Sequence, residues 1–327
     1  MSESLGARIV GVGRNLPSKV LTNKDIENIV ETTEEWIVSR SGIKERRIAD
    51  ANVSTHELGI PAAKEALATS GIDATDIDLI ICATSTPDKM FPSTACLIQE
   101  GISAGECPAF DLLAACSGFT YGLKVADSFI RSGGAKNVLL VASEIYSRII
   151  NWEDRSTCVL FGDAAAAVVL APSNGKSGVI DSTIYSDGKY GDLLSAGGAG
   201  ARAPADSKLS HGYYLEMKGK ETFKVAVKRM TDVSLAILEK NGYTADDIKL
   251  VIPHQANIRI IHAVSKALKL EENKVFINVQ KYGNTSAASV PLALYEALEE
   301  GRLREGDIAL LVTFGGGLTW GASLIRW

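Results

Sequence analysis

The chain has 327 residues, of which 46% are hydrophobic and 22% charged. A chain of this length and composition can bury a large core, so we expect one or two ordinary globular domains and exclude a largely disordered protein. The formal net charge is −5, and the Lys and Arg residues are scattered, which argues against a nucleic-acid-binding protein.

The cysteines and the apolar segments narrow the class further. The five cysteines include no closely spaced CxxC pair, which excludes a disulfide framework and a structural zinc site and predicts free thiols and no metal. Residues 1–13 contain no basic segment followed by an apolar run, and no run of about eighteen apolar residues occurs anywhere. We therefore expect a soluble, cytoplasmic protein with no membrane partner.

The first glycine-rich stretch, "GVGRNL" at residues 11–16, is similar to a dinucleotide-binding loop only in part. Leu16 takes the place of the third glycine and Pro17 follows directly. A Rossmann site needs a helix that begins directly after the glycines and binds the dinucleotide phosphates with its N-terminus. This sequence does not fit that pattern, so we exclude a nicotinamide-binding Rossmann site.

Four strand-like runs alternate with amphipathic helical stretches. They lie at residues 77–84, 137–143, 248–254 and 308–314. This alternation is typical of a mainly parallel α/β protein, and runs that are apolar throughout predict strands buried on both faces. We therefore expect sheets with helices above and below them.

An internal repeat relates the two parts of the chain. "GIDATDIDLII" from Gly71 resembles "GYTADDIKLVI" from Gly242, at a shift of 171 residues (242 − 71). The same shift places "LLVAS" from Leu139 on "LLVTF" from Leu310. Two segments that agree on one shift favour a duplicated unit over chance similarity. The predicted halves are residues 1–171 and 172–327.

Cys116 lies in "LLAACSGFTYGLKVADSFI", residues 112–130, where a strand-like run gives way to a helical pattern. Unpaired N–H groups and the dipole at a helix start favour a thiolate, so Cys116 is a candidate nucleophile. The alternative is a small core residue, because free cysteine is often simply buried. At the shift of 171, Cys116 falls on Ala287, which also opens a helix. The two helix starts would then meet near the centre of the molecule.

Three further features could supply chemistry beside this cysteine. Among the four histidines, His254 stands out because it follows a strand, where α/β folds place their sites. Asn284 precedes the second helix start; it could be a turn or cap residue, or an amide donor. Gly315, Gly316 and Gly317 follow the last strand, where a tight turn is expected and where glycine also lets a backbone N–H approach a reacting carbonyl.

Residues 257–270 predict an amphipathic helix with a basic face. At about 100° per residue, its apolar side is formed by Ile260, Ile261, Val264, Ala267 and Leu268. The opposite side carries Arg259, His262, Lys266 and Lys269. Such a face is usually just solvated, but it could receive an acidic partner. Residues 195–210, in contrast, show no apolar period and predict a long loop.

Five motifs together resemble the β-ketoacyl-acyl-carrier-protein synthase III family. In chain order they are "EEWIVSRSGIKERR", "ACSGF", "HQAN", "GNTSAAS" and "FGGGLTWG". The resemblance runs nearly end to end. It implies an α/β, thiolase-like, five-layered αβαβα fold with two duplicated halves, and a homodimer. Plant-type polyketide synthases share the Cys, His and Asn set, but the fuller motifs and the length favour synthase III.

The resemblance also implies an activity. The enzyme would be an acyltransferase that condenses an acyl-CoA primer with malonyl-acyl carrier protein, releasing CoA and CO2, at the start of fatty acid synthesis. Cys116 would carry the acyl group, and His254 and Asn284 would stabilise the enolate formed by decarboxylation. The N–H groups of Cys116 and Gly316 would form the oxyanion hole. No metal, flavin or nicotinamide cofactor is implied.

Further residues take roles by the same resemblance. Trp36 and Arg155 would flank the adenine of coenzyme A, and Arg40 would meet its phosphates. Arg259 would guard the tunnel. Phe91, in "KMFPSTAC", would cross the dimer interface to close the acyl pocket of the partner.

The acidic carrier protein would dock on the basic helix face, at Arg259, Lys266 and Lys269. One alternative is a related condensing enzyme or acyltransferase of specialised, polyketide-like metabolism that uses a CoA-linked acceptor. A non-catalytic scaffold of the same fold is disfavoured, since it would have no reason to keep a nucleophile, an imidazole, an amide and three glycines together. Primer length and branching are not predicted.

Overall fold

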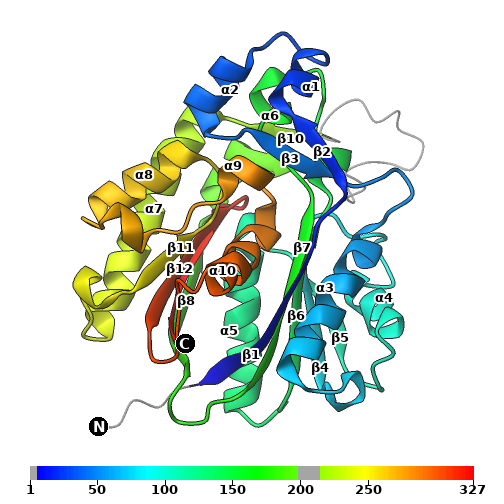
Figure 1. Ribbon diagram of the computed structural model, residues 1–327, viewed down its shortest axis with the longest axis vertical. Coiled ribbons are helices and arrows are strands. Elements are labelled where there is room, and N and C mark those ends of the chain that lie inside the picture. The colour runs from blue at the N-terminus through cyan, green and yellow to red at the C-terminus, as the bar shows by residue number, and fades with distance from the viewer. Residues whose placement is uncertain (1–5, 198–213) are drawn as a thin grey trace.

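The computed structural model describes residues 6–197 and 214–327 (Figure 1). The loop predicted at residues 195–210 begins inside a short strand, β9 (Leu194–Ala196), and its residues 198–210 lie outside the described part of the chain.

The first sheet has five strands in the order β1-β7-β6-β4-β5. Their bounds are β1 Ala7–Asn15, β4 Leu79–Ala83, β5 Ala109–Leu112, β6 Val138–Glu144 and β7 Ala164–Pro172. Every residue of β4 and β6 is buried, as predicted for their apolar runs, and burial extends to Ser143 and Glu144 at the end of β6. β4 is parallel to β5 and β6, whereas β7 is antiparallel to β6 and β1.

The second sheet has four strands in the order β11-β12-β13-β8. Their bounds are β8 Gly178–Ser186, β11 Leu250–Pro253, β12 Ile308–Gly315 and β13 Thr319–Arg326. β11 and β12 are parallel, and the other pairs are antiparallel. Beyond β11, one isolated parallel bridge joins Val251 to Val275, where the first sheet has a complete strand, β5, beside β4.

These strand directions show that the expectation of a mainly parallel protein was wrong. The two sheets contain three parallel and four antiparallel pairs. An apolar run reports burial on both faces and carries no information about the direction of the neighbouring strand. The short 316–318 connection between β12 and β13 allows only antiparallel pairing, because a parallel crossover needs a dozen or more residues.

The helices complete five layers, as predicted (Figure 1). On the outer face of the first sheet lie α3 (Thr55–Ser70) and α4 (Thr94–Gly101). Between the sheets lie α5 (Gly118–Arg131) and α10 (Ser289–Glu299), each contacting strands of both sheets. The outer face of the second sheet is covered by α7 (Gly219–Lys240), with α8 (Ile258–Ala267) packed beside it.

Helix α5 shows why the middle layer forms. Its side chains Phe119, Leu123, Ala126 and Ile130 recur every three or four residues and are all buried, which places one apolar stripe in the core between the sheets. Among the described residues, none of the helices is long and apolar enough to cross a lipid bilayer.

A group of short elements lies at one end of the sheets, at the top of Figure 1. They are β2 Lys19–Thr22, α1 Asn23–Glu27, α2 Glu34–Ser41, β3 Glu45–Ile48, α6 Arg155–Cys158, β10 Leu215–Met217 and α9 Val279–Tyr282. The starts of α5 and α10 point towards this end.

Equivalent elements of the two sheets lie 171 residues apart. β1 begins at Ala7 and β8 at Gly178, and α5 begins at Gly118 and α10 at Ser289. The one-turn 3₁₀ helices that precede α5 and α10 are related in the same way: η2 (Ala115–Ser117) and η7 (Ser286–Ala288). The predicted boundary between residues 171 and 172 falls at the last residues of β7 and stays a prediction.

Candidate active site

Cys116 lies in a sharp turn at the entrance to α5. Ala115 before it has a φ of 45°, a left-handed conformation that non-glycine residues rarely adopt. Cys116 itself is 3% exposed. At the first residue of the helix, a Cβ on Gly118 would lie 3.0 Å from the Cβ of Ala83 and 3.1 Å from that of Ala287. The absence of a side chain therefore lets this turn pack tightly against the second half.

The environment of the thiol differs from the expectation. Burial raises the pKa of the Cys116 thiol to about 12, and the Glu144 carboxylate nearby raises it as well, while the Ser286 hydroxyl lowers it. Burial therefore opposes the contribution that we expected from the helix start. At neutral pH the proton is on the sulfur.

His254 follows β11, at the carboxyl end predicted for it, and is 3% exposed. Its backbone N–H donates to the Val312 carbonyl at 2.8 Å, and its Nδ1 lies 2.6 Å from Ser289 Oγ. Burial lowers the pKa of His254 to about 3, so the imidazole is neutral. When the Ser289 hydroxyl donates to Nδ1, the ring proton is on Nε2, which can then donate to a ligand.

Asn284 lies between α9 and η7 and is 7% exposed. Its backbone N–H donates to the Leu160 carbonyl at 2.8 Å, and its carbonyl accepts from the Gly162 N–H at 3.1 Å. The side-chain Oδ1 accepts from the Ser286 N–H at 2.8 Å. Because the oxygen is used in this way, the Nδ2 amino group is turned outward as a donor.

The three side chains share one cavity. A space of about 570 Å³ is lined by Cys116, His254 and Asn284, and also by Phe314 at the end of β12. Cys116 also lines a second cavity of about 450 Å³, whose walls include apolar side chains such as Ile149 and Leu215. The structure therefore brings the predicted catalytic set together, with the sulfur between two spaces.

The predicted oxyanion hole has suitable surroundings. Gly316 lines the second cavity together with Cys116. Among the bonds between described residues that lie outside the helices and strands, the Gly316 N–H donates none. A Cβ on the preceding Gly315 would lie 2.6 Å from the Cys116 nitrogen, so glycine is needed for these two turns to approach each other.

Two family models match this chain. The model described as 3-oxoacyl-[acyl-carrier-protein (ACP)] synthase III matches residues 110–188, and its C-terminal model matches residues 238–327. The curated β-ketoacyl-[acyl-carrier-protein] synthase III of Roseiflexus castenholzii is 52% identical over 98% of this chain and 98% of its own length. The chain belongs to the synthase III family.

Solved structures agree with this assignment. The crystal structure of 3-oxoacyl-[acyl-carrier-protein] synthase III from Aquifex aeolicus is 51% identical, has a TM-score of 0.93, and matches 98% of this chain and 100% of its own. The priming β-ketosynthase of the R1128 polyketide pathway has a TM-score of 0.91 at 34% identity, over 100% of this chain and 98% of its own. As a synthase III, the chain is a condensing acyltransferase of the thiolase fold. Relatives of such identity over the full chain support a role in the initiating condensation of fatty acid synthesis.

Two of the four residues expected to bind coenzyme A line the 570 Å³ cavity of this synthase III. Arg40 and Arg259 line it directly. Trp36 and Arg155 lie together outside it: the Arg155 guanidinium carbon is 4.8 Å from the centroid of the Trp36 ring, and that of Arg40 is 5.8 Å away on the same ring. An aromatic ring between two guanidinium groups gives favourable cation–π contacts.

The basic face predicted on α8 is only partly as expected. Ile261, Val264 and Leu268 are buried, but Ala267 is exposed. Helix α8 ends at Ala267, so Lys269 lies beyond the helix, with a φ of 54°. The helix predicted over residues 257–270 is therefore too long at its C-terminal end. The residues there are good helix formers, and nothing in their sequence signals the left-handed residue beyond the helix end.

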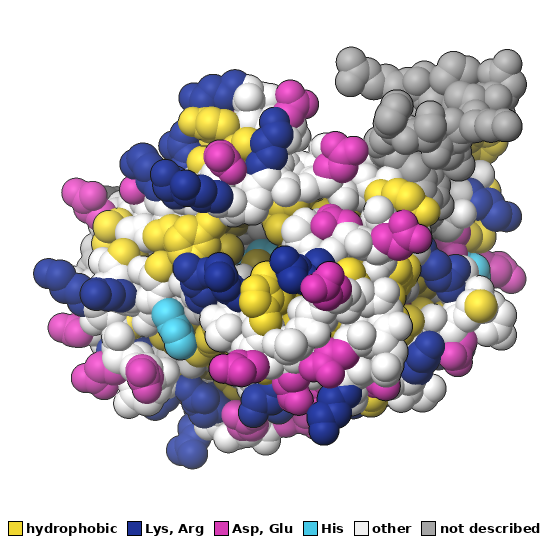
Figure 2. All heavy atoms as spheres, turned by 90° about the horizontal axis from the view of Figure 1, so that it is seen from above, with side chains coloured by type: hydrophobic (Ala, Val, Ile, Leu, Met, Phe, Trp, Pro, Cys, Tyr) yellow, Lys and Arg dark blue, Asp and Glu magenta, His cyan; other side chains and the backbone are white. Residues whose placement is uncertain are grey.

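Arg259 and Lys266 lie on α8 and are exposed, as is Lys269. On the face seen in Figure 2, Lys and Arg side chains rim a hollow between hydrophobic side chains. Lys220 and Lys224, on the first turns of α7, also line the 570 Å³ cavity. The sequence analysis missed these two, although Lys at i and i+4 on a helix predicts one basic face.

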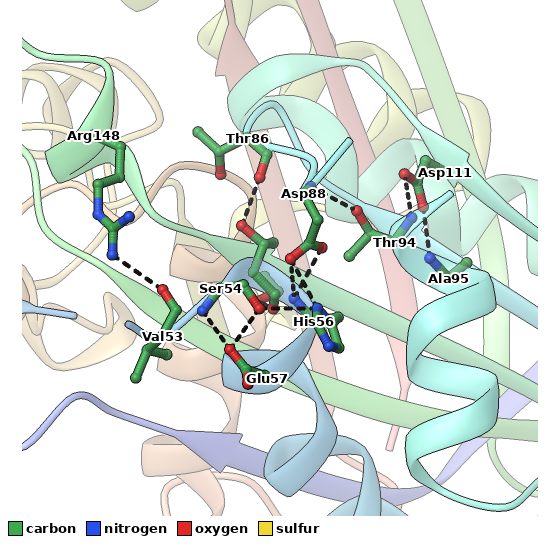
Figure 3. Close-up of polar contacts among 12 residues, drawn as sticks. Val53, Ser54, His56, Glu57, Thr86, Asp88, Thr94, Ala95, Asp111 and Arg148 are labelled. Carbon is green, nitrogen blue, oxygen red and sulfur yellow. Dashed lines mark hydrogen bonds and ion pairs between the residues drawn. The ribbon is translucent and has the colours of Figure 1, made fainter. Parts of the chain in front are cut away.

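Phe91 lies in the loop between β4 and α4 and is 82% exposed. Figure 3 shows how this loop is held: the Asp88 carboxylate accepts from the backbone N–H of His56 at 3.1 Å and lies 2.8 Å from its Nδ1. The Asp88 N–H in turn points to the Thr94 hydroxyl at 3.4 Å. The loop is therefore ordered while the aromatic ring projects outward.

Two more residues were missed because nothing local marks them. Ser289 is bonded to His254 across 35 residues of chain, and Glu144 is fully buried at the end of β6. Among the described residues, no group of three or more His, Cys, Asp or Glu side chains could hold a metal ion.

Proposed function

We propose that this synthase III condenses an acyl-CoA primer with malonyl-acyl carrier protein, with loss of CO2, to give β-ketoacyl-acyl carrier protein and CoA. The observation that carries the proposal is that Cys116, His254 and Asn284 line one cavity. A nucleophile, a neutral imidazole and an amide donor around one space are the groups this chemistry needs. The reaction involves no net oxidation, so we propose that no redox cofactor takes part.

In the first half-reaction, Cys116 Sγ would attack the thioester carbonyl of the acyl-CoA. The N–H groups of Cys116 and Gly316 would stabilise the oxyanion, and the C–S bond to coenzyme A would then break. One thioester replaces another, so this step is nearly balanced in energy. The acyl chain would occupy the 450 Å³ cavity with its apolar walls, and the pantetheine arm the 570 Å³ cavity.

In the second half-reaction, malonyl carrier protein would enter by the pantetheine cavity. Decarboxylation leaves an enolate, whose oxygen would accept hydrogen bonds from His254 Nε2–H and Asn284 Nδ2–H. A neutral imidazole suits this role, because it donates without first having to gain a proton. The enolate carbon would attack the acyl-Cys116 carbonyl, and loss of CO2 drives the condensation.

Binding and assembly are part of the same proposal. Adenine would insert between Trp36 and Arg155; since each stacking contact takes about 3.5 Å, the guanidinium must move away from its present 4.8 Å.

Phe91 and Leu113 follow neighbouring parallel strands and are 82% and 76% exposed, and we propose that this apolar edge is the homodimer interface. Five free cysteines suit the reducing cytoplasm, where we place the enzyme.

The test is mass spectrometry of the protein after incubation with a panel of acyl-CoA thioesters. We expect one acyl adduct on Cys116, lost in Cys116→Ala and reduced by on the order of 10⁴-fold in rate in Cys116→Ser, since an alcohol is far less acidic than a thiol. Cys82→Ala, which removes another fully buried thiol, is the matched control and should acylate normally. Acylation at another residue, or none with any thioester, would overturn the proposal.

The acceptor has one serious alternative. The similarity to a priming ketosynthase of a polyketide pathway leaves open a condensation in specialised metabolism onto a CoA-linked acceptor. Malonyl-acyl carrier protein and malonyl-CoA, compared side by side with the same acyl-enzyme, separate the two, and we expect condensation with the carrier-protein form.

A further inference from the structure

Glu144 is a buried acid that the mechanism above does not use. It is 0% exposed, at the last position of β6. One carboxylate oxygen, Oε2, accepts from the Ser85 N–H at 3.0 Å, the Thr86 hydroxyl at 3.0 Å and the Thr84 hydroxyl at 3.3 Å. The loop that supplies these donors is the ordered β4–α4 loop of Figure 3, anchored through Asp88.

The other oxygen is available. Oε1 of Glu144 is buried and forms no hydrogen bond within the described residues, although the Ser286 hydroxyl and the Ala287 N–H lie close enough to favour the ionised carboxyl. Ser286 is in η7, which packs against both β6 and η2. Its hydroxyl also lies beside the Cys116 sulfur and 3.0 Å from Tyr146 Oη. Ser286 therefore lies close to both the nucleophile and the free oxygen.

The titratable groups that face this carboxyl are few. Cys82 on β4, Cys116 in η2 and Tyr146 in η3 (Tyr146–Arg148) are each coupled to it, and η7 presents the Ser286 hydroxyl and the Ala287 N–H. Burial raises the pKa of Glu144 to about 7, whereas the pKa of each of the other three groups is raised above its usual range. Two negative charges so close together would repel, so Glu144 and Cys116 are not both ionised.

This arrangement bears on where the thiol proton goes. Cys116 must lose its proton to become acylated, and His254, with a pKa of about 3, is a poor acceptor for it. Among the groups described beside the sulfur, the Glu144 carboxyl gains a proton most readily near neutral pH.

We propose that Glu144 accepts the Cys116 proton, through the Ser286 hydroxyl, as the acyl group is transferred to the sulfur. This inference rests on the proposed function. As Cys116 Sγ bonds to the acyl carbon, its proton passes to Ser286 Oγ while the Ser286 proton passes to Glu144 Oε1. The carboxylate becomes a carboxylic acid, and the departing coenzyme A thiolate takes a proton from solvent.

The second half-reaction reverses the transfer. When the enolate carbon attacks and the C–S bond to Cys116 breaks, the thiolate regains a proton through Glu144 and Ser286. Over the full cycle the enzyme is unchanged, and one proton is taken up from solvent together with the release of CO2. Glu144 is thus a positioning and proton-transferring residue that acts on the nucleophile through Ser286.

The direct test is infrared difference spectroscopy of the wild-type enzyme during single-turnover acylation, at about pH 8.5, where Glu144 with its pKa of about 7 is mainly ionised at equilibrium. We expect a C=O stretch of a protonated carboxylic acid that appears as the acyl-enzyme forms and decays as the acid returns its proton to solvent; the band shifts in D2O and is absent from Glu144→Gln. Acylation of the wild type without such a band would overturn the inference and leave the proposed function intact.

A kinetic test is independent of the spectroscopy. In the wild type, the single-turnover rate of acyl-Cys116 formation should rise with pH through about 7 and then level off, because Glu144 must be ionised to accept the proton. Glu144→Gln should lose this inflection and acylate about 10²-fold more slowly at neutral pH. Asp163→Asn is the matched control: Asp163 is also buried with a raised pKa, but bonds to Ser147 and Ala49. If Asp163→Asn removes the inflection and Glu144→Gln keeps it, the assignment to Glu144 is wrong.

Discussion

The turns that open α5 and α10 have the same backbone but different chemistry. Ala115 and Ser286, 171 residues apart, have φ values of 45° and 51°, and each turn packs against the end of the central strand of the other half, η2 against β12 and η7 against β6. Yet one turn carries Cys116 and the other has Ala287 in its place.

The difference extends to the surrounding positions. At the same shift, His254 corresponds to Ala83, Ser289 to Gly118, and Glu144 to Gly315. At each of these positions one half has a reactive or hydrogen-bonding side chain and the other a small residue; Asn284 is the exception, since it corresponds to Leu113. The tight approach of Gly118 and Gly315 to the neighbouring turns shows the reason: a symmetric pair of reactive residues would not fit, so the site is divided between the halves.

Removing the donors of the second half should separate the two half-reactions. In His254→Ala and Asn284→Ala, the enolate loses a stabilising hydrogen bond, and we expect condensation to fall by about 10²–10³-fold in each. Acylation of Cys116 by acyl-CoA should change far less, because neither side chain contacts the oxyanion of that step. Acyl-enzyme formation by mass spectrometry and CO2 release from malonyl carrier protein measure the two steps separately.

His262→Ala is the control for these variants, since His262 is exposed on α8 and is not among the residues that line the catalytic cavity. Equal losses of acylation and condensation in His254→Ala would contradict the division of labour between the halves.

Ser289 corresponds to Gly118 in the first half, and we expect its removal to slow condensation less than the removal of His254 or Asn284. Ser289→Ala removes the hydrogen bond to His254 Nδ1, worth about 1 kcal/mol, and should lower the rate constant for condensation by about 5–10-fold. KM for both substrates should stay unchanged, because the hydroxyl faces the imidazole. Ser182→Ala, which removes another buried serine hydroxyl, bonded to Ser323, should leave condensation at the wild-type rate. If Ser182→Ala lowered the rate constant for condensation as much as Ser289→Ala does, the effect of Ser289→Ala would be a general loss of packing and not the loss of its hydrogen bond to His254.

The sequence alone identified those candidate residues of the shared cavity whose position in an element marks them. Cys116 at a helix start and His254 at a strand end are such positions, and the internal repeat related the two helix starts at a shift of 171 residues. Apolar strands alternating with amphipathic helices predicted sheets with helices above and below them, whereas the five layers were implied by the resemblance to the synthase III family. Strand direction did not follow, because burial on both faces is the same for parallel and antiparallel neighbours.

Properties created by packing between the halves could not be predicted. Ser289 is one of several small polar residues in "GNTSAAS", and only the fold brings it to His254. The pKa of Cys116 depends on burial and on Glu144, neither of which the local sequence reveals. A helix start predicts the sign of one contribution but not the desolvation that outweighs it.

The outer helices offer a last and weaker contrast. Helix α8 carries Arg259 and Lys266 and no acidic residue, whereas α3, on the opposite outer face, mixes Lys64 with acidic side chains. If α8 receives an acidic carrier protein, Arg259→Glu and Lys266→Glu should raise KM for malonyl carrier protein by up to about tenfold, and less at high salt, because exposed charges are screened. KM for acyl-CoA should rise less, and in Lys266→Glu hardly at all, since of these two residues only Arg259 lines the cavity.

Lys64→Glu makes the same charge change on α3 and should alter neither KM. If it raised KM for malonyl carrier protein as much as the α8 variants do, the net charge of the enzyme, and not a docking face on α8, would determine how the carrier protein binds.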